Sequence, residues 1–126
     1  MSLAIALLLS LLLPDAKIAV TSTGPKPESE AEARFGRARW YLIYDPAGRS
    51  WEAVDNSQAA QAPGGAGTQA ADMLARRGVT VVITGECGPK ALRVLSSAGI
   101  KLFQAAGRTV TKALRDYEAG RLAELR

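Results

Sequence analysis

The fold is decided by the stretch Val79-Thr-Val-Val-Ile-Thr-Gly-Glu-Cys-Gly-Pro-Lys90. Its first five residues, 79–83, are β-branched and almost all apolar, which favours a strand buried on both faces of a parallel sheet. Thr84 and Gly85 end this strand, and Gly88-Pro89 begins a segment, 90–98, with apolar residues at helical spacing. Proline is common in the first turn of a helix because its missing N–H needs no partner there. The stretch therefore predicts a strand, a glycine-bounded loop and a helix.

The loop of this unit is the predicted functional centre. In open α/β sheets, ligands bind where such strands reach their carboxyl ends. The only cysteine of the chain, Cys87, lies in this loop, and Lys90 adds a positive charge next to it.

The totals restrict the classes of protein that this chain can belong to. Its 126 residues fit one domain, and a net charge of +4 suits an anionic partner. One cysteine excludes a disulfide within the chain and an iron–sulfur cluster held by four thiolates of the chain, and fits a reducing compartment. The absence of histidine excludes histidine metal sites and general bases. The aromatic residues are few and mostly fall inside apparent strands, so nucleic-acid binding is not expected.

Residues 1–16 differ in composition from the rest of the chain. The apolar run 3–13 has eleven residues, whereas a membrane-spanning helix needs about twenty. No basic residue precedes the run, and Pro14-Asp15-Ala16 is a poor cleavage site. Three interpretations stay open: an export signal, a segment that packs on the domain or on a partner, and an upstream start that adds a dispensable tail. We expect the domain to span residues 17–126 and the protein to be cytoplasmic, with export as the alternative and a membrane protein not expected.

The order of predicted elements is βββαβαβα. Strands are expected at 17–23, 38–44, 50–54, 79–83 and 100–103, and helices at 68–77, 90–98 and 110–119. Thr109 is the expected cap of the last helix, and Gly120 ends it before a short charged tail. A hairpin followed by alternating helices and strands implies a single α/β domain with a mixed five-stranded sheet, of which the ribonuclease H-like arrangement is one example.

The acidic residues do not support a nuclease. That chemistry needs carboxylates converging on two metal ions, normally with one on the first strand, and residues 17–23 contain none. The other candidates fall at turns or on helix faces; they are Asp45, Asp55, Asp72 and Asp116.

Two loop features have both a functional and a structural interpretation. The glycines of 64–67 precede a helix, where backbone N–H groups can approach an anion, although glycines also simply make tight turns. Neither nucleotide-binding glycine motif is present. Cys87 lies near a helix N-terminus, where the dipole favours a thiolate, a soft ligand for copper(I), iron or a sulfide-rich cluster. Alternatively, it is a half-buried side chain whose pKa the adjacent Glu86 raises.

A basic group surrounds the first loop, and its members are Lys26, Arg34, Arg37 and Arg39. Such a group is usually a solvated face. Strand alternation places Arg37 and Arg39 on one side, where they could instead line a pocket for an anion.

Six motifs, in this order, resemble the dinitrogenase iron–molybdenum cofactor biosynthesis family, which includes NifX-like carriers, the C-terminal domain of NifB-like proteins and the orange proteins of sulfate reducers. The motifs are Lys17-Ile-Ala-Val-Thr-Ser, Arg34-Phe-Gly-Arg-Ala, Val54-Asp-Asn, Gly65-Ala-Gly-Thr-Gln-Ala-Ala, Ile83-Thr-Gly-x-x-Gly-Pro-Lys-Ala and Ala98-Gly-Ile. The resemblance spans residues 17–125. It implies a ribonuclease H-like α/β fold.

The resemblance implies binding rather than catalysis, and hence a protein that is not an enzyme. Its members bind or carry anionic metal–sulfur clusters that contain molybdenum with iron or with copper. For this chain it implies a cradle of cluster-binding residues, with Cys87 as the metal ligand. The cradle residues are Arg34, Arg37, Gly65, Gly67, Thr84, Gly85, Gly88 and Lys90.

Two departures from the family pattern matter. Members typically begin with Met directly before the first strand, so residues 1–16 favour the upstream-start interpretation. Where some relatives have histidine, this chain has Glu86, so Cys87 is the only soft ligand left. Two other classes stay open: a protein–protein module that partners a P-loop ATPase in cluster assembly, and an enzyme acting on a small anion, for which no acid–base pair is visible.

Overall fold

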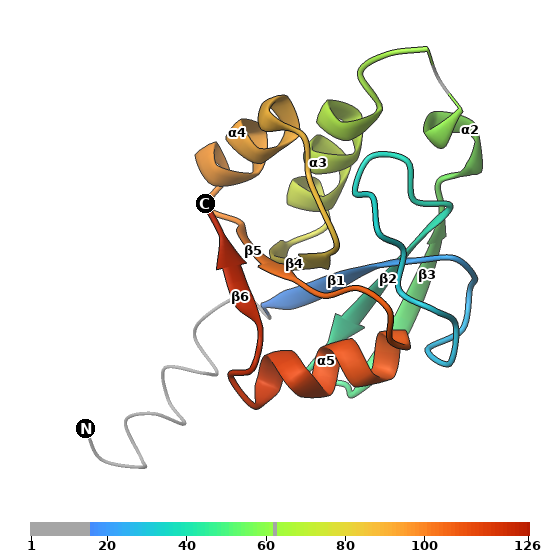
Figure 1. Cartoon of the computed structure of the whole chain (residues 1–126), viewed down its shortest axis with the longest axis vertical. Helices are drawn as coiled ribbons and strands as arrows, with labels where there is room; N and C mark the ends of the chain where they lie inside the picture. The colour runs from blue at the N-terminus through green and yellow to red at the C-terminus, as the bar shows by residue number, and fades with distance from the viewer. Residues whose placement is uncertain (1–15, 62) are drawn as a thin grey trace.

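The computed structural model describes residues 16–61 and 63–126. One mixed sheet runs through the molecule in the strand order β3-β2-β1-β4-β5-β6 (Figure 1). The strands are β1 (Lys17–Ser22), β2 (Trp40–Asp45), β3 (Ser50–Asp55), β4 (Val79–Thr84), β5 (Lys101–Gln104) and β6 (Ala123–Leu125). The predicted extension 1–16 lies, except for residue 16, outside the described residues, so its interpretations stay predictions.

The strand directions follow from the connections. β4 is parallel to both of its neighbours, β1 and β5. A helical connection leads into β4 and another joins β4 to β5, as is usual for parallel strands. β2 and β3 form the predicted antiparallel hairpin, and β2 is antiparallel to β1. The single-domain mixed α/β class is confirmed. The ribonuclease H-like label stays a prediction.

The predicted number of five strands is wrong, because the charged tail contains a sixth strand. β6 pairs antiparallel with β5, with Leu102 opposite Leu125. Gly120, at φ 73°, turns the chain after the last helix and lets it return to the sheet edge. Leu122 and Leu125 then pack against opposite sides of the sheet, which gives this short segment its anchor.

The helices of the described part of the chain are α2 (Ser57–Ala60), α3 (Ala66–Arg76), α4 (Pro89–Ser97) and α5 (Val110–Glu118). α2 is a single turn that the sequence analysis missed, and the other three match the predicted helices to within two residues. Figure 1 shows α3 and α4 side by side on one face of the sheet and α5 on the other. Within the described residues, no helix has the length and apolar character needed to cross a bilayer.

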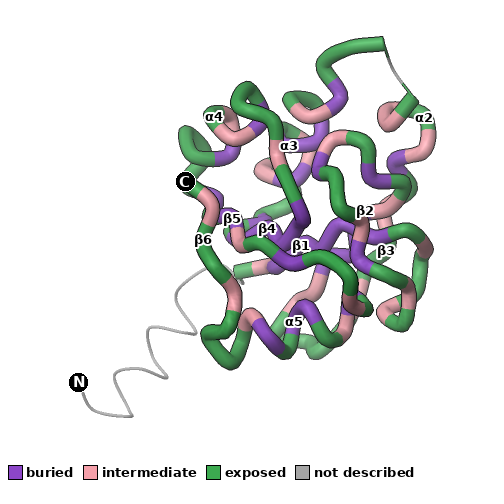
Figure 2. The backbone as a smooth tube through the Cα atoms, viewed as in Figure 1, coloured by how far each residue is buried: buried purple, intermediate pink, exposed green. Residues whose placement is uncertain are grey.

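Two hydrophobic clusters hold the layers together. One lies under α3 and α4 and includes the fully buried Leu74 and Leu95, while the other lies against α5 and includes Val20 and Val110. Figure 2 shows the buried residues concentrated along the strands and on the inner sides of the helices. β4 contributes to both clusters, as its unbroken apolar sequence predicts for a central strand.

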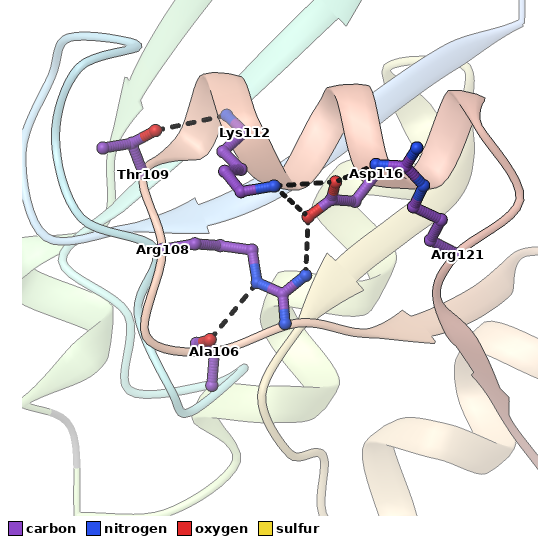
Figure 3. Close-up of polar contacts among 6 residues, drawn as sticks. All are labelled: Ala106, Arg108, Thr109, Lys112, Asp116 and Arg121. Atoms are coloured by element: carbon purple, nitrogen blue, oxygen red, sulfur yellow. Dashed lines mark hydrogen bonds and ion pairs between the residues drawn. The ribbon is translucent and has the colours of Figure 1, made fainter.

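A buried carboxylate fixes α5 to the loop before it. The Asp116 side chain is only 6% exposed and accepts hydrogen bonds from Arg108 at 2.7 Å and from Lys112 at 3.0 Å, with Arg121 at 3.9 Å (Figure 3). The bond from Lys112, together with that from Arg108 and both charges, lowers the pKa of Asp116 below its ordinary value against the opposing effect of burial. Thr109 caps α5 as predicted, its hydroxyl accepting from the Lys112 N–H.

We expect Asp116→Asn to lower the urea midpoint of unfolding at pH 7, because the amide leaves the surrounding cations without their shared counter-charge. A carboxylate whose pKa is lower when folded stabilises the fold above its unfolded pKa of about 4, and that contribution disappears as the pH falls through the folded pKa. The difference between wild type and variant should therefore be largest near neutral pH and vanish in acid. Glu118→Gln, exposed on the same helix, is the control. Equal midpoints for wild type and Asp116→Asn at pH 7 would contradict this role.

Candidate functional site

Backbone hydrogen bonds hold the arginine-bearing loop 33–37 against the cysteine-bearing loop 85–88. The Glu86 N–H donates to the Ala33 carbonyl at 2.6 Å, and the Phe35 N–H donates to the Glu86 carbonyl at 3.0 Å. Arg34 and Glu86 thus form an isolated parallel bridge just beyond the carboxyl end of β4. As a result, Arg34 and Cys87, far apart in the sequence, lie over the same end of the sheet.

Two close backbone contacts complete this arrangement. A Cβ added to Gly36 would lie 2.6 Å from the Gly67 nitrogen and 2.7 Å from its Cα, so loop 33–37 touches the first turn of α3. A Cβ on Gly85 would collide with the Ala33 carbonyl oxygen and lie 2.7 Å from the Ala33 Cα. Glycine is required at both positions because backbone approaches backbone.

The N-termini of α3 and α4 open beside these loops. Gly65 precedes α3 at φ 76°, and Gly88 precedes α4 in an extended conformation. Neither helix has a side-chain cap or an acidic residue in its first turn. A Cβ added to Gly67 would lie 3.0 Å from the Cβ of Ala91, so the first turns of the two helices lie together. Uncapped N–H groups and the positive ends of both helix dipoles therefore point to a common region that favours an anion.

Three adjoining hollows surround this region. We call them the thiol hollow (about 310 Å³), the glycine hollow (about 370 Å³) and the arginine hollow (about 320 Å³). The thiol hollow shares Gly36 and Gly88 with the glycine hollow. It shares Arg34 and Arg37 with the arginine hollow. The thiol hollow is lined by Arg34, Phe35, Gly36, Arg37, Glu86, Cys87 and Gly88. The glycine hollow is lined by Gly36, Gly65, Gly67, Thr68, Gly88, Pro89, Lys90 and Ala91. The arginine hollow is lined by Arg34, Arg37, Arg39, Ser57, Ala60 and Gln61.

Cys87 is half-buried, and burial raises the pKa of its thiol to about 11. The thiol also lies 3.6 Å from the Gly88 carbonyl, to which it can donate. Burial therefore favours the protonated thiol, the opposite of what the nearby helix N-terminus favours. The half-buried interpretation agrees with this direction, with burial rather than Glu86 as the cause, and metal ligation by Cys87 stays a prediction. The phenol of the buried Tyr41, which donates to the Phe35 carbonyl, also has a raised pKa, through burial and then through Cys87.

Most of the predicted binding residues come together. Arg34, Arg37, Cys87 and Gly88 line the thiol hollow, and Gly65, Gly67 and Lys90 line the adjoining glycine hollow. Arg37 and Arg39 line one pocket, but both precede β2, so the strand alternation on which this prediction was based does not apply to them.

Thr84 and Gly85 line none of these three hollows. Thr84 is buried and its hydroxyl oxygen lies 3.0 Å from that of Thr21, which donates to it. The Gly85 carbonyl accepts a hydrogen bond from the Gln104 side chain at 3.1 Å. These hydrogen bonds hold the chain in place where β4 passes into loop 85–88. A direct role of Thr84 or Gly85 in binding stays a prediction.

Sequence reasoning missed two contributors to the site. Gly36 joins loop 33–37 to α3, and its only signal was its place in the Arg34-Phe-Gly-Arg motif. The α2 turn supplies Ser57 and Ala60 to the arginine hollow, the following Gln61 also lines it, and nothing in this alanine-rich sequence indicated the turn.

The donor set fits an anionic cluster held mainly by charge and N–H groups. In residues 16–61 and 63–126 no group of three or more acidic or cysteine side chains could enclose a metal ion. Cys87 offers one bond to a soft metal, while Arg34, Arg37 and Lys90 supply positive charge around it.

Comparison with known proteins gives consistent matches. The sequence model of the family described as dinitrogenase iron-molybdenum cofactor matches residues 15–120. The apo form of the orange protein from Desulfovibrio gigas has 38% sequence identity and a TM-score of 0.84, over 89% of this chain and 94% of that one. A putative NifB protein from Thermotoga has 34% identity and a TM-score of 0.78, over 87% and 93%. An uncharacterized protein of Methanocaldococcus jannaschii is 26% identical over 101 residues, which are 78% of this chain and 85% of the relative.

Proposed function

We propose that this chain binds and carries an anionic metal–sulfur cluster and catalyses no reaction. The proposal proceeds from the fact that the chain belongs to the dinitrogenase iron–molybdenum cofactor family. The similarity to the orange protein and to the putative NifB protein supports a role in handling such cofactors. The cargo would contain molybdenum with iron or with copper.

One observation carries this proposal: three separate segments direct positive charge and N–H groups into adjoining hollows. Loop 33–37 brings two arginines, the first turn of α3 brings uncapped N–H groups, and loop 85–88 with the first turn of α4 brings the thiol and Lys90. An anionic cluster placed there would meet no acidic side chain except Glu86 among the residues that line the thiol and glycine hollows. This residue set has no paired acid and base, which supports carriage rather than catalysis.

We expect Arg37→Ala to weaken cluster binding about tenfold, as the loss of a charge-assisted contact of about 1.4 kcal/mol would. The remaining binding should depend less on salt, because one of the attracting charges is gone. Both quantities come from equilibrium dialysis of the reconstituted cluster at several salt concentrations, with the bound metal measured.

Two controls separate charge from structure. Arg37 donates to the Ala60 carbonyl at 2.8 Å, so Arg37→Lys tests whether charge without the guanidinium restores the salt dependence. Arg115→Ala removes an exposed charge from α5, on the far face of the sheet (Figure 1), and should change nothing. Unchanged affinity and unchanged salt dependence in Arg37→Ala would remove Arg37 from the proposal.

The interaction module that partners a P-loop ATPase is the alternative. It predicts that a partner binds this loop face in the absence of any cluster. Partner binding that persists in protein unable to retain metal would favour that alternative.

A further inference from the structure

The arginine hollow has a lining unlike that of the other two. Among the described residues that line it, three of six are arginines and none is acidic. Arg34 and Arg37 also line the thiol hollow. Arg39, the α2 residues Ser57 and Ala60, and the following Gln61 line neither the thiol nor the glycine hollow. This part of the site therefore lies outside the two hollows assigned to the proposed cargo.

The backbone around this hollow is held in place by specific bonds. Arg37 donates to the Ala60 carbonyl at 2.8 Å, which fixes its guanidinium against α2. The Asn56 N–H donates to the Arg39 carbonyl at 2.8 Å, and the Asn56 side chain donates to the Ala38 carbonyl at 2.9 Å. Because Asn56 is buried, these bonds tie the segment that carries Arg39 rigidly to the start of α2.

The nearby carboxylates do not occupy the hollow. Asp55 accepts hydrogen bonds from the Ser57 side chain and N–H and lines a different hollow with the first residues of α2, although Arg39 is near enough to help lower the pKa of Asp55. Glu32 lies 3.9 Å from Arg34, whose side chain is 62% exposed, so this pair is loose. Positive charge therefore predominates at the lining.

We infer that the arginine hollow is a separate subsite for a tetrahedral oxyanion, such as phosphate, sulfate or molybdate. A guanidinium presents parallel N–H groups that match two oxygens of such an anion, and Arg34 and Arg39 both line this hollow. The hollow is open enough for the anion to keep part of its hydration.

Sharing Arg34 and Arg37 couples this subsite to the thiol hollow. An oxyanion there adds negative charge beside the cluster and competes for the same two arginines, so each anion weakens the other. Linkage requires the effect to be reciprocal, and coupling between sites is typically about tenfold. This second half of the inference rests on the proposed function, and an oxyanion would then favour cluster release.

The test begins with equilibrium dialysis of molybdate against the full chain, free of metal and at low ionic strength, with phosphate and sulfate as competitors. We expect one saturable site in the wild type and an affinity at least about tenfold lower in Arg39→Gln, from the loss of a charge-assisted contact. Arg115→Gln, on the exposed side of α5, should bind molybdate as the wild type does. Absence of a saturable site, or equal affinity in correctly folded Arg39→Gln, overturns the subsite.

A second arm measures the coupling. Cluster retention is followed with and without saturating phosphate in wild type and in Arg39→Gln, which should hold the cluster normally because Arg39 does not line the thiol hollow. We expect phosphate to weaken cluster binding about tenfold in the wild type and much less in the variant. Equal cluster binding with and without phosphate overturns the coupling. If no variant retains a cluster while molybdate binding still depends on Arg39, the proposed function fails and the oxyanion subsite stands.

Discussion

Replacing Gly36 by alanine is expected to destabilise the protein by about 3 kcal/mol, the upper end of the usual cost of overpacking. The added Cβ would lie 2.6 Å from the Gly67 nitrogen, a distance that side-chain adjustment cannot relieve because Gly67 presents only backbone. Either loop 33–37 or the first turn of α3 must move. The urea midpoint should fall at an unchanged slope, as expected when the native packing and not the exposed surface changes.

The same substitution tests how the cradle is built. Moving loop 33–37 away from α3 separates Arg34 and Arg37 from the N–H groups of the helix, so cluster retention should fall even in protein that is still folded. Gly64→Ala is the matched control: a Cβ there meets nothing within 4 Å in the described structure, and we expect a change below about 0.5 kcal/mol. Equal stability of Gly36→Ala and Gly64→Ala would show that the Gly36–Gly67 contact is not as close as described.

The second large effect concerns Cys87. If Cys87 binds the cluster as a thiolate, binding must remove the proton of the thiol. A thiol pKa of about 11 means that this removal is costly at neutral pH. Between pH 7 and 9 the Cys87 thiol of the free protein stays protonated. The apparent affinity for the cluster should therefore rise about tenfold per pH unit over this range. Cys87→Ser should bind the cluster more weakly and lose this part of the pH dependence.

The pH experiment is a comparison of two slopes. Any change in the cluster itself with pH affects wild type and Cys87→Ser alike, so only the difference between the slopes reports the thiol. Equilibrium dialysis with metal analysis gives both. Parallel slopes would mean that Cys87 lies beside the cluster without ligating it, and that charge and N–H donors alone hold the cargo.

Local patterns predicted the elements of this fold well. The apolar run 79–83 and the glycines that bound it identified the central strand, and the spacing of apolar residues identified α3, α4 and α5. β6 was missed because three residues with a glutamate among them carry no strand signal until Leu125 meets Leu102. α2 was missed because four residues are too few to show a helical period.

The site was predictable by its residues but not by its contacts. Arg34, Arg37 and Cys87 were each identified, yet nothing local to them showed that the Phe35 and Glu86 backbones would pair. Burial as the cause of the raised pKa of the thiol also escaped prediction, because it depends on how far the folded chain covers Cys87, whereas the sequence shows only the adjacent Glu86 and the nearby helix N-terminus. Long-range packing, rather than residue type, decides both.

The central claim is that the thiol and glycine hollows hold an anionic metal–sulfur cluster. It is tested most directly by anaerobic reconstitution of the purified full chain with tetrathiomolybdate and copper(I), and separately with tetrathiomolybdate, iron and sulfide, followed by desalting. The visible spectrum and the bound metal per chain are then measured. Our account predicts a coloured, stoichiometric complex that survives desalting in the wild type and is diminished by Arg37→Ala. Absence of retained metal under every condition, in protein shown to be folded, would contradict it.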